Sequence, residues 1–269
     1  MEELEYAYQF KELLENSLKK LYRPDLAIAF SGGLDSSVMA KMMLNLGFKF
    51  KAYVVGVKGC KDIVQAKKVS KEIGLNLEVI ELTEAEIEKA IPMQRDILLE
   101  LYNKQPAKEL DVNAIPISYN LPLYFVAKYS KETNIFLSQG PDEMLGGYTR
   151  HLKLEKTQAL KEMENNLQDF LNYGLKQNIL TGEHFSKNFI MPYLDEKIID
   201  FCLKLPYELK IKDGIRKHIL RTLALEIGLS HETAFKPKRA AQYGSGIIYT
   251  MKSLAKKRKV HISRYIREC

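Results

Sequence analysis

One short stretch, residues 31–37, constrains the fold of this chain more than any other. It reads Ser-Gly-Gly-Leu-Asp-Ser-Ser and follows an apolar run, Ala-Ile-Ala-Phe, at residues 27–30. This order predicts a buried strand, a glycine turn and a helix that begins near Leu34. Unpaired backbone N–H groups and the positive end of the helix dipole gather at such a junction. The stretch is therefore typical of a loop that holds a phosphate chain.

The residue types in this loop indicate how it would bind. Gly32 and Gly33 let the backbone approach an anion closely and can take positive φ. The hydroxyl donors of the loop are Ser31, Ser36 and Ser37. Asp35 would repel a phosphate unless a cation lay between them, so it indicates Mg²⁺. The Gly-Lys-Ser/Thr ending of the Walker-type loop is absent from the stretch, which excludes that class of nucleotide site here.

The first half of the chain alternates between strand and helix patterns. Strands are expected at residues 26–30, 50–57, 76–82 and 134–138. Helices are expected at residues 2–21, 34–46, 62–73 and 117–131, and Thr83-x-x-Glu86 is a capping box that opens one more. Residues 91–116 have a less regular pattern. The alternation predicts an α/β fold, in which a parallel sheet is covered by helices on both faces.

The second half of the chain has no strand pattern. Residues 152–172, 195–204, 215–227 and 247–258 are expected to be helices. We therefore divide the chain into an N-terminal helix at 1–21, an α/β nucleotide-binding core at 22–150 and a helical C-terminal portion at 151–269.

A second motif follows the fourth expected strand, at residues 138–148. It reads Ser-Gln-Gly-Pro-Asp-Glu-Met-Leu-Gly-Gly-Tyr and combines a strand end, a turn and two acids. Ligands of parallel sheets bind beyond the carboxyl ends of the strands, so Ser31 and Asp142 can meet in space. We expect Asp35 and Asp142 to hold Mg²⁺ together with phosphate oxygens. The alternative is that Asp142 and Glu143 only begin a helix, where acids are favoured.

Composition indicates the cellular compartment in which the protein is expected. No apolar stretch is long enough to span a bilayer, and the acidic N-terminus does not resemble a signal peptide. Cys60, Cys202 and Cys269 lie far apart in the sequence with no metal-binding spacing, which favours a reduced, cytoplasmic protein. The net charge is +7, with an excess of Lys and Arg over residues 252–267. This run is either a solvated helix face or a contact surface for RNA or polyphosphate.

The two motifs together resemble a known family. Residues 31–37 resemble the PP-loop of the N-type ATP pyrophosphatases, and residues 141–148 are close to the Asp-Glu-x-x-Gly-Gly-Tyr block of the asparagine synthetase and β-lactam synthetase family. Further blocks in the same order are residues 55–59 with Asp62, 191–195, 217–221, 236–238 and 244–246. The resemblance covers residues 22 to about 250 and is to the synthetase domain of that family.

The resemblance implies a role for each matched residue. ATP would be cleaved between its α- and β-phosphates while an acceptor oxygen is adenylated. The residues implied to bind ATP are Ala29 and Val55 at the adenine, Ser138 and Gln139 near the ribose, and Ser31, Gly33, Asp35 and Ser36 at the pyrophosphate. Gly32, Ser37 and Gly140 complete the expected nucleotide-binding set. The residues implied in catalysis are Lys217 and Lys238, which would stabilise negative charge on the phosphates, and Asp142 and Glu143.

The sequence also departs from that family. Residue 2 is Glu2 and the PP-loop comes soon after, which leaves no room in this sequence for an N-terminal glutaminase domain. Nitrogen would then come from free ammonia, a separate glutaminase chain or an amine of the substrate. Gln139 stands where asparagine synthetases carry a Glu, and a neutral amide cannot act as a base. Pro116 and Ile190 stand where the family has arginines, so the acceptor need not be aspartate.

Three functions remain open from the sequence. The first is an ATP-dependent, AMP- and pyrophosphate-forming ligase that makes an amide on a small carboxylate. The second is a tRNA-modifying PP-loop ATPase, which the basic C-terminal run would serve. The third is a subunit that binds ATP or AMP without turnover. The acceptor, the nitrogen donor and the oligomeric state are not encoded in any motif of this chain.

Overall fold

The parallel sheet is the centre of the molecule. The computed structural model describes residues 2–103, 114–237 and 241–269 of the 269-residue chain. The five strands of the sheet are β1 (Leu26–Ala29), β2 (Lys51–Val57), β3 (Leu77–Leu82), β4 (Asn134–Phe136) and β5 (Asn188–Ile190). All of their pairings are parallel, which confirms the fold class predicted from the strand–helix alternation.

The order of the strands creates a switch point beside β1. The sheet runs β3-β2-β1-β4-β5, so the chain first moves outward from β1 to one edge and then returns to continue on its other side. Ala29 pairs with Tyr53 of β2, and Ile28 pairs with Phe136 of β4. The loops that follow β1 and β4 therefore leave the same edge side by side. Parallel sheets bind ligands at this place, because the two loops diverge there and leave a crevice.

Helices surround the sheet. Those before β4 are α1 (Glu2–Leu21), α2 (Leu34–Asn45), α3 (Lys61–Ile73), α4 (Glu84–Asn103) and α5 (Ala114–Tyr129). Between β4 and β5 lie α6 (Pro141–Met144), η1 (Thr149–Lys153), α7 (Lys156–Asp169), η2 (Phe170–Gly174) and α8 (Leu175–His184). After β5 come η3 (Pro192–Leu194), α9 (Glu196–Lys204), α10 (Tyr207–Lys210), α11 (His218–Glu226), α12 (His231–Ala234), α13 (Ala241–Gly244), α14 (Ile247–Lys257) and α15 (Ile262–Glu268).

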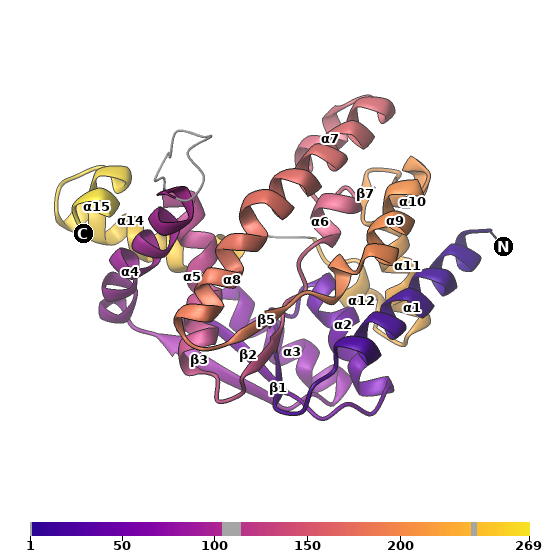
Figure 1. Ribbon diagram of the computed structural model, residues 1–269, viewed down its shortest axis with the longest axis horizontal. Helices are drawn as coiled ribbons and strands as arrows, with labels where there is room; N and C mark the ends of the chain where they lie inside the picture. The colour runs from indigo at the N-terminus through magenta and orange to yellow at the C-terminus, as the bar shows by residue number, and fades with distance from the viewer. Residues whose placement is uncertain (1, 104–113, 238–240) are drawn as a thin grey trace.

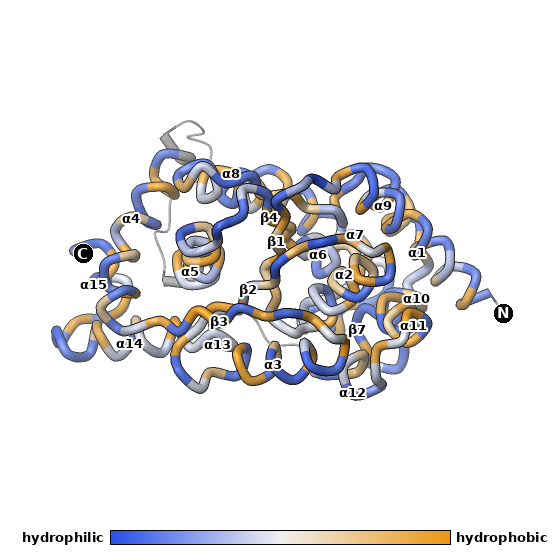
Figure 2. Tube along the Cα trace, turned by 90° about the horizontal axis from the view of Figure 1, so that it is seen from below, coloured by the Kyte–Doolittle hydropathy of each residue, from blue (hydrophilic) through white to orange (hydrophobic). Residues whose placement is uncertain are grey.

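Alternate residues of each strand pack into opposite layers. In β1, Leu26 and Ile28 join a core with α1, α2, α9 and α11, whereas Ala27 joins a core with α4, α5 and α14. Successive side chains of a strand point to opposite faces, so a strand covered on both faces is apolar throughout. Figure 2 shows β1 between α5 on one side and α2 on the other.

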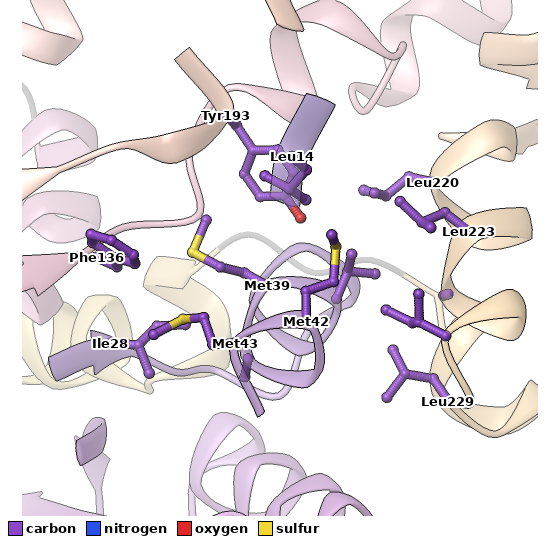
Figure 3. Packing of buried hydrophobic residues seen from close by; sticks show 14 of the residues in the cluster. Leu14, Ile28, Met39, Met42, Met43, Phe136, Tyr193, Leu220, Leu223 and Leu229 are labelled. Atoms are coloured by element: carbon purple, nitrogen blue, oxygen red, sulfur yellow. The ribbon is translucent and has the colours of Figure 1, made fainter. Parts of the chain in front are cut away.

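Helix α2 is enclosed by elements from both halves of the sequence. Met39, Met42 and Met43 are almost fully buried and belong to one hydrophobic cluster with Leu14 of α1, Ile28 of β1 and Leu220 of α11 (Figure 3). Unbranched methionine side chains fill irregular gaps between several elements well. Because α2 begins directly after the PP-loop, this packing holds the loop in place.

Helix α4 is longer than the sequence pattern indicated. Residues 91–116 were expected to be irregular, but α4 continues through Pro92 to Asn103. Residues 104–113 lie outside the described part of the chain. A proline inside a helix removes one hydrogen bond. Burial of Ile87, Ile91 and Leu98 on one face of α4 offsets that loss, because it removes apolar surface from water.

The absence of strands after residue 150 was a wrong prediction. Strand β5 pairs in parallel with β4, and β6 (Ile211–Lys212) and β7 (Ile215–Arg216) form an antiparallel hairpin where a helix from residue 215 was expected. Strands this short carry too little periodicity to be recognised. Asp213 and Gly214 both have positive φ at the hairpin turn, and an Asp-Gly pair is a turn signal that the helix prediction overlooked. The domain boundary at residue 150 stays a prediction.

The described helices also bear on membrane insertion. Within residues 2–103, 114–237 and 241–269, no helix combines the length and the apolar character needed to cross a bilayer.

Candidate active site

A cavity of about 520 Å³ opens at the switch point of the sheet. It lies where the loop after β1 and the loop after β4 leave neighbouring strands. The predicted site residues that line it are Ser31, Gly32, Gly33, Asp35, Ser36, Ser138, Gln139, Asp142, Glu143 and Lys217. Two motifs separated by about a hundred residues and a third from the last quarter of the chain thus meet in one cavity.

The PP-loop is held in a compact turn. Gly32 has φ 67°, and a Cβ at this position would lie 2.8 Å from the backbone nitrogen of Ala66 in α3. Only glycine fits both this backbone angle and this close approach. The Ser36 hydroxyl donates to the carbonyl of Gly33 at 3.2 Å and lies 3.3 Å from the Ser31 hydroxyl. The loop therefore presents its hydroxyls and the start of α2 to the cavity.

The two predicted metal-binding carboxylates meet at one lysine. The Lys217 ammonium lies 2.6 Å from Asp35 Oδ2 and 2.6 Å from Asp142 Oδ1. Asp35 Oδ2 and Asp142 Oδ1 therefore lie no farther apart than twice 2.6 Å. Burial by itself would lower the pKa of Lys217, but the charges of Asp142 and Asp35 outweigh it and raise the pKa. Lys217 stays charged, and it places a cation between the two carboxylates.

Gly147 makes this approach sterically feasible. A Cβ on Gly147 would lie 1.9 Å from Asp142 Oδ1 and 2.6 Å from Lys217 Cε, so any larger residue would displace one of them. The backbone of Lys217 has φ 56°, a left-handed conformation that is unusual for a lysine. Its N–H donates to the carbonyl of Leu145 at 3.1 Å, which ties the start of α11 to the second motif.

Glu143 is a buried acid beside this cluster. Its side chain lines the cavity, and the residue is only 6% exposed. Burial, followed by the charge of Asp142, raises the pKa of Glu143 to about 7, although a hydrogen bond from the Tyr148 hydroxyl opposes the shift. A carboxyl group with this pKa exchanges a proton near neutrality, as general acids and bases do. Asp142 and Glu143 do begin the short helix α6, yet both also line the cavity.

Gln139 lines the cavity, and neutral amides of α5 and α8 lie behind it and behind Tyr119. Gln139 accepts a hydrogen bond from the buried Asn178 side chain, and the Asn178 carbonyl oxygen has no partner among the described residues. Tyr119 lines the cavity and donates to Gln177 Oε1 at 3.0 Å, and Asn120 donates to the same oxygen at 3.2 Å. This side of the cavity therefore offers hydrogen-bonding groups rather than charge.

Several residues of the cavity were not predicted to be in the site. They are Leu34, Lys61, Asp62, Gln65, Tyr119, Tyr148, Phe170, Arg221, Lys236 and Pro237. Asp62, Tyr148, Arg221, Lys236 and Pro237 belong to blocks that carried the family resemblance, so those blocks were the available signal. Tyr119 and Phe170 lie in helices with no motif, and only the packing of α5 and η2 places them at the cavity.

The remaining predicted residues lie elsewhere. Ala29, Ser37, Val55 and Gly140 do not line the cavity, although Ala29 and Val55 sit in the strands that lead to it. Ser37 is fully buried, and its hydroxyl has no hydrogen-bond partner among the described residues. Lys238 lies outside the described residues.

The donor set fits Mg²⁺ bound together with a nucleotide. Asp35 and Asp142 converge on the Lys217 ammonium, and their carboxylates are hard oxygen donors. Within the described part of the chain, no group of three or more His, Cys, Asp or Glu residues could hold a metal ion alone. A magnesium ion held by these two carboxylates would therefore need phosphate oxygens as its further ligands, and the Lys217 ammonium would have to move aside for it.

Comparison with known proteins identifies the family of this chain. The sequence profile of the family described as Asparagine synthase matches residues 9–188 and 161–264. This chain belongs to the asparagine synthase family. It is 27% identical over 286 residues to a putative glutamine-hydrolysing asparagine synthetase of Methanocaldococcus jannaschii, covering 91% of this chain and 50% of the relative. It is also 27% identical over 256 residues to the glutamine-hydrolysing asparagine synthetase of Gallus gallus, covering 90% and 43%.

The matched relatives are longer than this chain. The chain spans about half the length of the curated asparagine synthetases that it matches. Among solved structures, NMN synthetase from Francisella tularensis matches 96% of this chain and 97% of its own, with 15% identity and a TM-score of 0.34. A structural similarity at this level carries no argument about function. The family membership rests on the sequence.

Proposed function

We propose that this chain is an ATP-dependent ligase of the asparagine synthetase type. It would adenylate a carboxylate oxygen of a small acceptor, release pyrophosphate and form an amide with AMP as the second product. The observation that carries the proposal is that Asp35 and Asp142, from two separate motifs, converge in the switch-point cavity, where both contact the Lys217 ammonium. A site that only binds AMP has no need for two converging carboxylates beside its phosphate loop.

The phosphate side of the cavity has the donors that the reaction requires. The PP-loop hydroxyls of Ser31 and Ser36 and the start of α2 would hold the β- and γ-phosphates. Mg²⁺, when bound by Asp35 and Asp142, supplies neutralisation of phosphate charge. The ammonium groups of Lys217 and Lys236 line the same cavity and would stabilise negative charge on the departing pyrophosphate. We assign the same role to Lys238.

Glu143 would accept the proton from the nitrogen nucleophile. Its carboxyl lines the cavity beside Asp142, and its pKa of about 7 lets it take up a proton at neutral pH. Gln139 cannot do this, because an amide has no basic site in this pH range. Gln139, which Asn178 holds in place by a hydrogen bond, would instead orient the acceptor. The nitrogen would come from free ammonia or from a separate glutaminase chain.

The cysteines support a reducing compartment. Cys60, Cys202 and Cys269 are all free, and burial raises the pKa of Cys202 to about 12, which makes its thiol inert. We therefore place the reaction in the cytoplasm.

The test is release of pyrophosphate. Purified protein with ATP, Mg²⁺, ammonia and a panel of small carboxylic acids should release pyrophosphate and AMP with one of the acids. Asp35→Asn should lower this rate by about 100-fold or more, because it removes charge from the cation position. Asp200→Asn is the matched control, since Asp200 is exposed on α9 and lies outside the cavity.

Two outcomes would contradict the proposal that this chain is a ligase. One is a wild-type protein that releases no pyrophosphate with any acid of the panel. The other is an Asp35→Asn variant that is as active as the wild type while remaining folded by circular dichroism.

A further inference from the structure

A second hollow lies at the end of the molecule that carries the C-terminus. Its volume is about 410 Å³, and Lys252, Lys256, Lys259 and His261 line it above an apolar floor that includes Val260. The helices α14 and α15 that form it lie at the opposite end of the molecule from α1 (Figure 1). None of these residues takes part in the candidate active site.

The three lysines are not neutralised, although their neighbours are. Lys257 pairs with Glu84, and Arg258 Nη2 lies 2.8 Å from Glu88 Oε1 of α4. Among the described residues, Lys252, Lys256 and Lys259 have no carboxylate partner. Three uncompensated positive charges around one hollow create a local potential that attracts an anion.

Two exposed aromatic rings adjoin the lysines. Tyr249 lies three residues before Lys252 on α14, close to one turn of the helix, so both project from the same side. Tyr243 of α13 lies beside it, with ring centroids 6.1 Å apart. Tyr243 is 46% exposed and Tyr249 is 58% exposed, so both rings are accessible to a ligand. Exposed rings in line with unpaired lysines are the combination that binds single-stranded nucleic acid.

The aromatic pair begins at the wall of the active-site cavity. Gly244 follows Tyr243, and a Cβ at Gly244 would lie 2.0 Å from Asp62 Oδ1. Asp62 in turn lines the cavity that we assign to ATP. A strand lying on Tyr243, Tyr249 and the lysines would therefore start next to the cavity and run away from it.

We propose that Tyr243, Tyr249, Lys252, Lys256 and Lys259 form a binding surface for single-stranded nucleic acid. Bases stack on the two tyrosine rings, and backbone phosphates contact the three lysines. The surface is independent of the ligase chemistry, because it uses no residue of the candidate active site. Nucleic-acid binding would be a function for the Lys- and Arg-rich run at residues 252–267.

The test is binding of a labelled oligonucleotide without ATP. Fluorescence anisotropy with a fluorescein-labelled, single-stranded RNA of about 12 nucleotides, and with the same sequence as DNA, should show salt-dependent binding of at least one of them to the full chain. K252Q/K256Q/K259Q should bind more weakly and should reduce the slope of log K against log salt by about 2, since each phosphate contact on a single strand contributes about 0.7. Tyr249→Leu should bind about tenfold more weakly with an unchanged slope, because stacking releases no counterions.

A matched variant controls for total charge. K19Q/K197Q/K204Q removes three exposed lysines of α1 and α9, at the other end of the molecule, and should bind like the wild type. Absence of binding at low salt overturns the proposal, and so does a triple Lys252, Lys256 and Lys259 variant with the wild-type slope. An unchanged affinity of Tyr249→Leu, with equal binding of heparin or anionic vesicles, would show a charged surface without nucleic-acid recognition and would also overturn it. Pyrophosphate release is measured separately, so failure of the ligase proposal leaves this result interpretable.

Discussion

At the scale of single residues, neighbouring groups in the site shift each other's pKa values. Glu143 would be an ordinary acid in water, but burial and the charge of Asp142 raise its pKa to about 7. Lys217 would lose its proton more easily when buried alone, yet Asp142 and Asp35 raise its pKa. Sequence motifs located all four groups, whereas the pairing of Lys217 with both aspartates had no sequence signal. Tyr119 and Phe170 were missed for the same reason.

The ionisation of Glu143 should be visible in the pH dependence of amide formation. Because the pKa of Glu143 is about 7, the rate should rise as pH increases from about 6 to 8 and the carboxylate form accumulates. Glu143→Gln should be slower at high pH and should lose this rise. The measurement is kcat across that range. Glu196→Gln is the control, because Glu196 is exposed on α9. A Glu143→Gln profile that keeps the wild-type limb would exclude the residue as the proton acceptor.

The same shift has a consequence for stability. The folded pKa of Glu143 lies above its ordinary value, so the protonated group is the one that folding favours. Protonated Glu143 therefore stabilises the folded state fully below about pH 4.5, and this stabilisation is lost as pH rises through about 7. The protein therefore keeps a charge in its site at some cost in stability, as functional sites often do.

At the scale of elements, the start of α4 was predicted correctly from four residues. The Thr83 hydroxyl and N–H both donate to Glu86 Oε2, at 2.6 and 2.8 Å, and the Glu86 N–H lies 3.3 Å from Thr83 Oγ1. This confirms the capping box. The hydrogen bond from Thr83, followed by one from Tyr129, lowers the pKa of Glu86 to about 2. Such local signals are readable because donor and acceptor are neighbours in the chain.

Removal of the cap should destabilise the protein measurably. Thr83→Ala removes the hydroxyl that bonds Glu86, and it should lower the free energy of unfolding by about 1 kcal/mol. Thr83→Ser keeps the hydroxyl and should stay close to the wild type. Urea unfolding at neutral pH compares the three proteins. If Thr83→Ala unfolds at the wild-type midpoint, the cap contributes nothing in this context.

At the scale of the whole molecule, the first helix secures the element that carries Lys217. Glu3 of α1 accepts hydrogen bonds from Lys212 at 2.8 Å and from Thr222 at 2.9 Å, and it lies 2.8 Å from His218 Nε2. His218 begins α11 directly after Lys217. The hydrogen bond from Lys212, acting against partial burial, lowers the pKa of Glu3 to about 2. Residue 3 thereby fixes an element more than two hundred positions away.

Glu3→Gln should loosen this connection in a pH-dependent way. At neutral pH the variant should be less stable than the wild type by about 1 kcal/mol, since it loses charged hydrogen bonds at a partly exposed site. The folded pKa of Glu3 is lowered, so its contribution is present above about pH 4.5 and disappears as pH falls towards 2. Unfolding measured at pH 7 and near pH 2 should show a difference only at pH 7. An equal difference at both values would show that the charge of Glu3 is not involved.

The sequence by itself determined four strands of the parallel sheet, the turn after β1, the position of the second motif and the capping box of α4, because each depends on residues that are close in the chain. Only the tertiary structure decided that β5 joins the sheet beside β4, that Asn178 contacts Gln139, and that Lys217 lies between Asp35 and Asp142. Short strands and single side chains carry no periodicity of their own. Their places follow from the packing of elements distant in sequence, and the order of five strands around β1 sets that packing.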